Sequence, residues 1–146
     1  MKWKYDDLEL TTLACLFLHP ECMEGTILED KHFKNRCAVW IYMKTFYQKF
    51  KTFDLSLMTS FAKNKNKVLD VIMALMDYEP VPSNFKLYEK RLIEMYEQEE
   101  KEKQIVGIYY QLATDLFLGI ISLQEYKERL KRMEEKNEKG NEGTMD

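Results

Sequence analysis

The segment IVGIYYQLATDLFLGIISLQEYKERLKRM, residues 105–133, decides the fold, because it holds two helical apolar patterns on either side of one break. At 100° per residue, the first helix carries two apolar stripes about 110° apart. The first stripe is Ile105, Ile108, Tyr109, Leu112 and Leu116, and the second stripe is Val106, Tyr110, Ala113 and Phe117. Gly119 ends this helix and Ser122 caps the next, so the segment predicts a helical hairpin.

The second helix of this hairpin has only one narrow apolar stripe, formed by Leu123, Tyr126, Leu130 and Met133. One stripe can cover only one of the two stripes on the first helix. The other stays in water unless the rest of the chain or another protein covers it, and contact with a partner is the favoured interpretation. The predicted interface residues are Val106, Tyr109, Tyr110, Ala113, Leu116, Phe117, Leu123, Tyr126 and Leu130.

Eight polar residues, 97–104, precede the hairpin without an apolar anchor. Two helical turns of this kind cannot lie on an apolar core, so the helix is expected to leave the globule or to break there. The sequence therefore predicts a helical head over residues 1–96, a hairpin extension over 97–137 and a flexible tail over 138–146.

The head is predicted to be a bundle of five or six helices, which makes the whole chain all-α. With 146 residues, five Gly and three Pro, the chain has the length of one domain and few turn residues. Asp6 or Asp7 is expected to cap a first helix that His19-Pro20 ends, and a short helix is expected at 21–27. The nearly all-apolar helix at 35–49 is expected to lie at the centre of the bundle.

Two further boundaries follow from single residues. Asp54 is expected to cap another helix, and Ser83 begins a helical pattern that meets no breaker until Gly119 apart from the tolerated Gly107.

Positive charge is concentrated in the middle of the chain. Residues 31–67 contain nine Lys or Arg and one acidic residue, although the net charge of the whole chain is −3. Such a segment can face phosphate or an acidic partner. The alternative to protein docking is therefore sequence-independent DNA contact through five lysines. These are Lys49, Lys51, Lys63, Lys65 and Lys67.

Patterns for catalysis, cofactors and metals are not found in the sequence. The five glycines are scattered and no G-x-x-x-x-G-K-[ST] occurs, so no phosphate-binding loop of that kind is expected. Cys15 and Cys22 are too far apart for the usual zinc spacing and lie among apolar residues, so they are expected to be free thiols. Neither a secretory leader nor an uncharged apolar run of 18 residues is found, which favours a cytoplasmic, non-enzymatic protein that does not enter the membrane.

An ordered series of short motifs resembles a known family. The series is LELTTLACLFLHPE at residues 8–21, then Phe33, the Phe53-Asp54 step, and Ser83-Asn84 with Tyr88. The order and spacing are similar to those of the N-terminal domain of the DnaB-type replicative hexameric helicases. The chain departs from that pattern after Phe33, where a link is about two residues short, and at the acidic run 97–104.

The resemblance implies a helical collar with a protruding hairpin, without the ATP-driven motor that follows it in that family. In the family, such hairpins pair into dimers and help to build a ring, and the region docks the primase and helicase loaders. The function expected from the resemblance is that of a DNA-replication accessory protein, an adaptor, loader or inhibitor that binds a replicative helicase, primase or loader. The alternative is a DNA-binding replication initiator or organiser that uses the basic segment 31–67. A homodimer or larger oligomer and an origin in a phage or another mobile element are further expectations.

Overall fold

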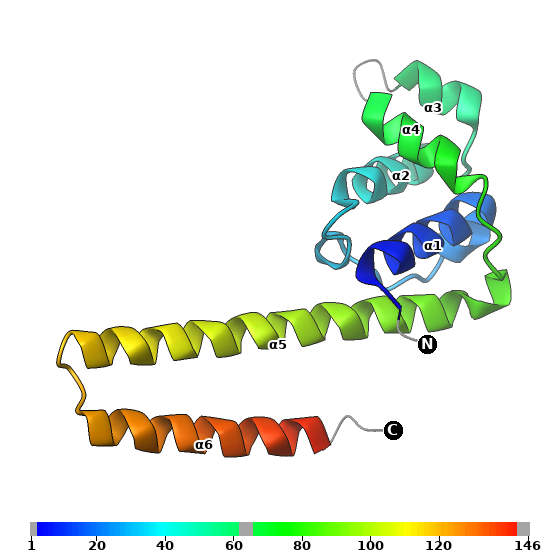
Figure 1. Cartoon of the computed structure of the whole chain (residues 1–146). Helices are drawn as coiled ribbons and strands as arrows, with labels where there is room; N and C mark the ends of the chain where they lie inside the picture. Colours follow the sequence, from blue (N-terminus) through cyan, green and yellow to red (C-terminus); the bar gives the residue numbers. More distant parts are fainter. Residues whose placement is uncertain (1–2, 62–65, 143–146) are drawn as a thin grey trace. The chain divides into compact units, whose positions relative to one another are not determined.

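The computed structural model describes residues 3–61 and 66–142, with side chains over 3–61 and 67–136. Within those residues the chain forms six α-helices, three short 3₁₀ helices and no strand, which confirms the all-α prediction (Figure 1). The chain divides into two compact units, unit 1 (Met1–Glu97) and unit 2 (Gln98–Asp146). The predicted boundary, after residue 96, lies one residue earlier.

Four α-helices and three 3₁₀ helices lie entirely in unit 1, and the first part of a fifth α-helix completes it. The elements of unit 1 are α1 (Tyr5–Leu18), η1 (Pro20–Met23), η2 (Asp30–His32), α2 (Cys37–Phe50), α3 (Leu55–Phe61), α4 (Asn66–Leu75) and η3 (Pro82–Asn84). Helix α5 (Phe85–Phe117) begins in unit 1 and continues into unit 2, which also contains α6 (Leu123–Glu142).

Helix α1 is the most deeply buried element of unit 1. Nine of its fourteen residues are buried, against six of the fourteen residues of α2. It contacts both α4 and η1, and Figure 1 shows it among the other helices of the unit. The prediction that the helix near 35–49 would be central is therefore only partly right, because α2 keeps an open face with Ile41 41% exposed.

The start of α1 differs from the prediction. Lys4 occupies the N-cap position and makes no side-chain hydrogen bond there, so neither Asp6 nor Asp7 is the cap. Both aspartates lie in the first turn instead, where a negative charge interacts favourably with the helix dipole. The end agrees with the prediction, because the helix stops at Leu18 before His19-Pro20.

Other boundaries of unit 1 are close to those predicted from single residues. Asp54 Oδ1 accepts a hydrogen bond from the Leu57 N–H at 3.0 Å, which confirms the predicted cap of α3. The predicted short helix at 21–27 is wrong in extent, because η1 ends at Met23 and Gly25 has a φ of 75°.

Unit 2 consists of the second part of α5, a short turn and α6, which runs back in the opposite direction (Figure 1). Helix α5 continues without a break through the polar residues 97–104. At its end, Gly119 has a φ of 73°, its N–H donates to Leu116 O, and the Ile120 N–H donates to Asp115 O at 2.9 Å. These two bonds form a Schellman motif, so Gly119 ends the helix as predicted.

Helix α6 also begins as predicted. The Ser122 hydroxyl accepts a hydrogen bond from the Glu125 N–H at 3.1 Å and caps the helix. The helix continues to Glu142, however, so the backbone at 138–142 is helical where a flexible tail is predicted. The remaining predicted tail, 143–146, lies outside the described residues.

The cysteines are free thiols in this structure. Cys15 is completely buried in the core of unit 1, while Cys22 and Cys37 are half-buried. Burial raises the pKa of the Cys15 thiol to about 12, and the nearby Cys22 adds to the shift. Cys15 is therefore an apolar packing residue in the folded chain.

Candidate protein-docking surface

The second stripe of α5 is open to solvent. Val106 is 67% exposed, Tyr110 is 75% exposed and Phe117 is 90% exposed, and Ala113 between them is also exposed. Their spacing of four, three and four residues places all four on one face of the helix. An aromatic residue that stays almost entirely in water does not contribute the free energy of its burial.

The first stripe of α5 is the better covered of the two. Leu112 is 5% exposed, Tyr109 and Leu116 are half-buried, and only Ile108 has more than half of its surface in water. On α6, Tyr126, Leu130 and Met133 are half-buried. Most of the first stripe of α5 and three of the four residues of the α6 stripe are therefore at least half-buried, whereas the second stripe of α5 is exposed.

The turn between α5 and α6 extends the open surface. Leu118, Ile120 and Leu123 are 63%, 67% and 55% exposed, whereas Ile121 is 7% exposed. The Schellman motif at Gly119 fixes the backbone of this turn. The exposed apolar residues of the second stripe and of this turn are called the hairpin surface below, and they are Val106, Tyr110, Ala113, Phe117, Leu118, Ile120 and Leu123.

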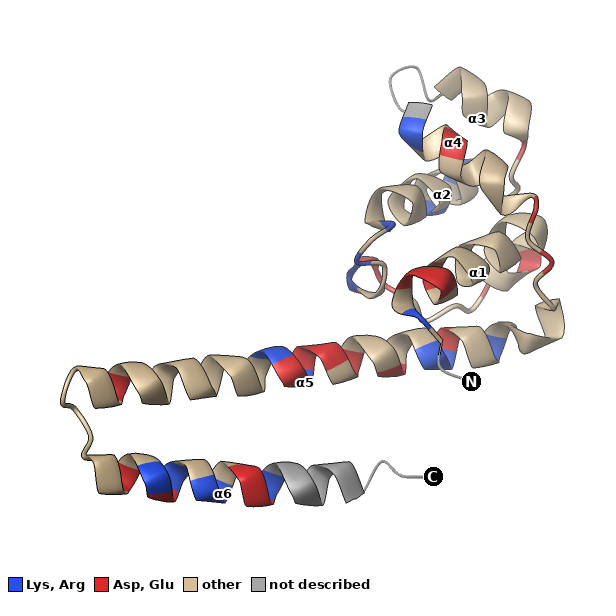
Figure 2. Cartoon of the chain, viewed as in Figure 1, with Lys and Arg blue, Asp and Glu red and all other residues tan. Residues whose placement is uncertain are grey.

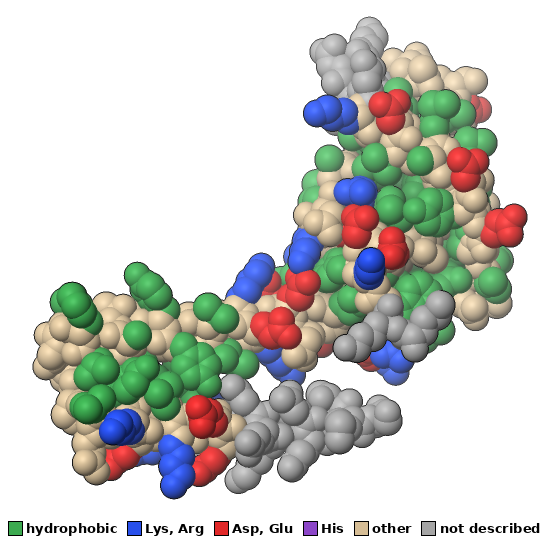
Figure 3. All heavy atoms as spheres, viewed as in Figure 1, with side chains coloured by type: hydrophobic (Ala, Val, Ile, Leu, Met, Phe, Trp, Pro, Cys, Tyr) green, Lys and Arg blue, Asp and Glu red, His purple; other side chains and the backbone are tan. Residues whose placement is uncertain are grey.

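Charge is nearly absent from the last part of α5, which carries most of the hairpin surface. Between residues 104 and 117 the only charged side chain is Asp115, whereas charged residues crowd the middle of α5 and the length of α6 (Figure 2). Figure 3 shows hydrophobic side chains gathered over the last part of α5 and the start of α6. Depletion of charge around exposed aromatic residues is typical of the centre of a protein–protein interface.

The predicted interface residues divide into two groups. Val106, Tyr110, Ala113, Phe117 and Leu123 are exposed, and Tyr109, Leu116, Tyr126 and Leu130 are half-buried. The half-buried group belongs to the first stripe of α5, with Tyr109 and Leu116, and to the stripe of α6, with Tyr126 and Leu130. Leu118 and Ile120 are not among the predicted interface residues. Two large apolar residues on either side of a helix-ending glycine are nevertheless a sequence sign of an exposed apolar turn.

The five lysines of the DNA-contact alternative do not form a group that the structure describes. Lys49 and Lys51 lie at the end of α2, and Lys67 lies in the first turn of α4. Lys63 and Lys65 fall outside the described residues. The Lys49 and Lys51 ammonium groups lie over aromatic rings, 4.8 Å from the ring centroid of Phe61 and 5.4 Å from that of Tyr47, respectively.

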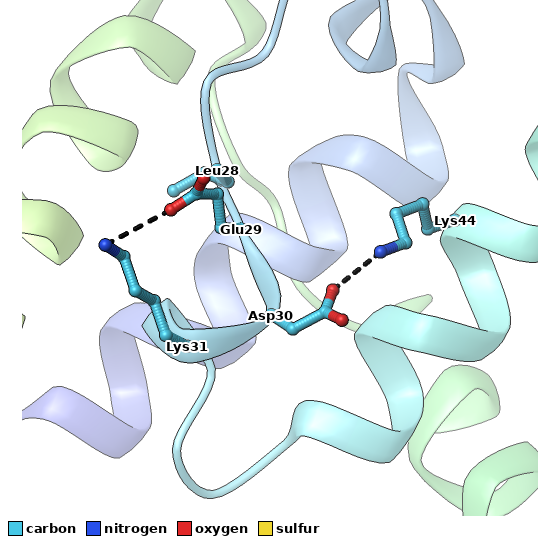
Figure 4. Close-up of a pocket in the computed structure, with 5 residues that line it drawn as sticks. All are labelled: Leu28, Glu29, Asp30, Lys31 and Lys44. Carbon is cyan, nitrogen blue, oxygen red and sulfur yellow. Dashed lines mark hydrogen bonds and ion pairs between the residues drawn. The ribbon is translucent and has the colours of Figure 1, made fainter.

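Other basic residues of the middle segment are already paired with carboxylates. Lys44 Nζ lies 2.7 Å from Asp30 Oδ1, and Lys31 Nζ lies 3.2 Å from Glu29 Oε2. These residues surround a hollow of about 380 Å³ beside Leu28 (Figure 4). The hydrogen bond from Lys44 lowers the pKa of Asp30 below its ordinary value, with a second one from the Trp40 indole. Since its charges neutralise each other, this hollow offers little to a ligand.

The structure also shows two buried carboxylates, Glu9 and Glu89, that no sequence pattern indicates. Glu9 is fully buried and accepts hydrogen bonds from the Asn35 backbone at 3.0 Å and from the Asn35 amide at 2.8 Å. Burial raises the pKa of Glu9, although the Asn35 hydrogen bonds oppose the shift. Glu89, 3% exposed, accepts from the Thr26 hydroxyl at 2.6 Å and the Ile27 N–H at 3.2 Å.

Both carboxylates tie loops of unit 1 to helices, and their oxygens are used in doing so. Within residues 3–61 and 66–142, no three His, Cys, Asp or Glu residues lie together in a way that would hold a metal ion. In the same part of the chain, none of the helices has the length and apolar character to cross a membrane.

No family model, curated protein sequence or solved structure matches this chain.

Proposed function

We propose that this chain is a non-enzymatic accessory protein of DNA replication that docks on a replicative helicase, a primase or a helicase loader through the hairpin surface. Replication is proposed on the motif series that resembles the helicase collar domain. Docking is proposed on one observation, the exposure of Tyr110 and Phe117 at 75% and 90% on a helix face with hardly any charge. Large aromatic residues of this kind are the usual anchors of protein interfaces.

The function follows from what such a surface does. A partner that covers Tyr110, Phe117 and the turn at Leu118 removes apolar surface from water, which favours association. As an adaptor, loader or inhibitor, the chain acts by occupying its partner or by joining two of them, and it needs no chemical step of its own.

The first test is the mass in solution, measured by light scattering for the chain alone and for mixtures with a replicative helicase and with a primase. We expect a dimer or larger assembly of the chain, or a stable complex in one of the mixtures. A monomer that ignores both proteins at concentrations well above micromolar would contradict the proposal.

A further inference from the structure

A second open surface lies in unit 1, on the outer face of α2. It is a groove of about 250 Å³, lined by Phe61 of α3 and by six residues of α2. The residues of α2 are Ile41, Tyr42, Thr45, Phe46, Lys49 and Phe50. This groove is separate in the chain from the hairpin surface.

The walls of the groove are aromatic and already packed against each other. The Phe46 and Phe50 ring centroids are 4.6 Å apart, those of Phe50 and Phe61 are 5.3 Å apart, and Phe61 meets Phe46 edge-on at 6.4 Å. Phe46 is 4% exposed and forms the floor, whereas Phe61 is 52% exposed at the rim. A groove whose aromatic walls are already held by contacts with each other costs little conformational entropy to fill.

One cation stands at the rim of this groove. Lys49 Nζ lies 4.8 Å from the ring centroid of Phe61 and 5.6 Å from that of Phe50. Among the side chains that the structure describes, no carboxylate pairs with Lys49, whereas Lys44 on the same helix is paired with Asp30. The Lys49 ammonium is therefore held beside the groove and is available to an incoming anion.

The surrounding chain adds to the positive charge. Residues 41–61, which include every residue that lines the groove, contain three lysines, Lys44, Lys49 and Lys51, and a single acidic residue, Asp54. The Asp54 carboxylate is engaged as the cap of α3 through the Leu57 N–H. The field near the groove consequently favours a negatively charged partner.

We propose that this groove docks an acidic peptide segment of a partner protein. An aromatic side chain of the peptide packs against Phe50 and Phe61 at the mouth of the groove, and a neighbouring carboxylate binds Lys49. The apolar walls favour this occupant over nucleic acid, because phosphate binding relies on several cations along a backbone. The site gives the chain a second, chemically different docking surface and is independent of the hairpin surface.

The test uses the full chain and fluorescence anisotropy with a labelled peptide, Gly-Ser-Asp-Asp-Phe-Asp-Glu-Gly. Two control probes are used, the same peptide with Ala in place of Phe and a labelled 12-nucleotide oligothymidylate. We expect saturable binding of the first peptide only. Lys49→Glu should weaken it roughly tenfold, because attraction at the rim becomes repulsion.

Two matched pairs of variants separate the groove from general charge and size effects. Lys127→Glu, at an exposed position of α6, makes the same charge change as Lys49→Glu and should leave binding within about twofold of the wild type, since Lys127 does not line the groove and an exposed charge contributes little. Thr45→Trp fills the groove and should abolish binding. Gln48→Trp, an exposed position of α2 outside the groove, should not. Circular dichroism checks that each variant is folded. If Thr45→Trp does not fold, the result for Lys49→Glu alone tests the groove.

The proposal is overturned by any of three results. The first is the absence of saturable peptide binding, and the second is equal binding of the peptide that lacks Phe. The third is an equal loss in Lys49→Glu and Lys127→Glu. If the oligothymidylate binds, loses affinity in Lys49→Glu and the peptide does not bind, the groove is a nucleic-acid contact instead.

Discussion

At the scale of single residues, Glu89 connects two segments of unit 1 that are far apart in sequence. Its carboxylate on α5 accepts hydrogen bonds from Thr26 and from the Ile27 backbone, more than 60 positions earlier. Lys86, one turn before it, contributes an ion pair at 3.3 Å. Removing a buried acceptor leaves its donors without partners, which is more costly than losing an exposed ion pair.

Glu89→Ala should therefore lower the free energy of unfolding by about 2–3 kcal/mol, because the Thr26 hydroxyl and the Ile27 N–H lose their acceptor. Urea denaturation followed by circular dichroism measures this change. The control is Glu94→Ala on the same helix, where an exposed glutamate pairs with Lys90 and Arg91 and should cost less than about 1 kcal/mol. Equal losses in the two variants would show that the buried bonds of Glu89 do not matter.

His32 gives unit 1 a pH dependence of defined sign. It is 5% exposed, and its Nδ1 accepts the Glu29 N–H at 2.9 Å, which requires a neutral ring. Burial, with Lys31 as a second cause, lowers the pKa of His32 from its ordinary value of 6.5. Its contribution to stability is therefore complete above that value and is lost as the pH falls through the folded-state pKa.

We expect the free energy of unfolding to fall on going from about pH 7 to about pH 5, and His32→Asn to reduce this dependence, since the histidine that must become charged is gone. The only other histidine, His19, provides the control, because His19→Gln should keep the wild-type dependence. If the pH dependence of the free energy of unfolding is unchanged in His32→Asn, or disappears in His19→Gln, then His32 is not its cause.

The buried carboxylates could not be predicted from the sequence, for a physical reason. Glu9 bonds to Asn35 and Glu89 to Thr26, and no local pattern encodes partners 26 and 63 positions apart. A carboxylate inside the otherwise apolar and hydroxyl-bearing stretch at 8–18 was the one available sign for Glu9. At Glu89, by contrast, nearby charged residues on the same helix made it look like part of a solvated face.

At the scale of elements, two glycines of α5 and its terminal turn should respond in opposite directions to the same substitution. Gly107 lies inside α5 and Gly119 has a φ of 73°, and a Cβ would meet no atom within 4 Å at either position. Gly107→Ala should stabilise the chain by about 0.5–1 kcal/mol through helix propensity. Gly119→Ala should destabilise it by about 1 kcal/mol, because a side chain disfavours the left-handed region.

Thermal denaturation followed at 222 nm compares the two variants directly. Because neither added methyl group meets a neighbour, the comparison isolates the backbone conformation. A stabilising effect of Gly119→Ala would contradict the helix-ending role of that glycine.

The ends of several helices were predictable because each depends on a few adjacent residues. Pro20, Asp54, Gly119 and Ser122 act on the backbone next to them, and all four mark boundaries in the structure. The start of α1 could not be predicted in this way. Asp6 and Asp7 look like caps, but the helix begins two residues before Asp7, at Tyr5. Tyr5 is buried and its hydroxyl donates to His32 O, a contact that favours including its turn in the helix.

At the scale of the whole molecule, association and folding should be separable by substitution. The double variant Tyr110→Glu/Phe117→Glu places two charges on the exposed second stripe. We expect it to abolish self-association or partner binding in light scattering, because buried unpaired charges oppose an interface. Its circular dichroism spectrum and its unfolding midpoint should stay close to those of the wild type, since both residues are largely in water already.

The matched control is Lys127→Gln/Lys131→Gln, which changes the net charge by the same amount at exposed positions of α6. This variant should associate like the wild type. Loss of association in both double variants would point to net charge, and survival of association in the first would contradict the docking role of the hairpin surface.

The sequence predicted the hairpin surface better than the groove of unit 1. The two stripes of α5 follow from helical geometry within 13 residues, so their positions could be worked out before any tertiary contact is known. The groove instead needs Phe61 to meet Phe46 and Phe50 across two helices. On a helix as apolar as α2, periodicity alone does not tell which face the rest of the unit leaves open.

The alkylation rate of the buried thiol in unit 1 reports how often that unit opens to solvent. All three cysteines lie in unit 1, and Cys15 alone among them is completely enclosed. With a pKa near 12, it holds almost no thiolate while folded, so iodoacetamide should alkylate Cys22 and Cys37 first. The slower modification of Cys15, followed by mass spectrometry, then counts how often the interior around α1 is exposed to solvent. Because residues 98–146 contain no sulfhydryl, that count excludes any fraying of the hairpin.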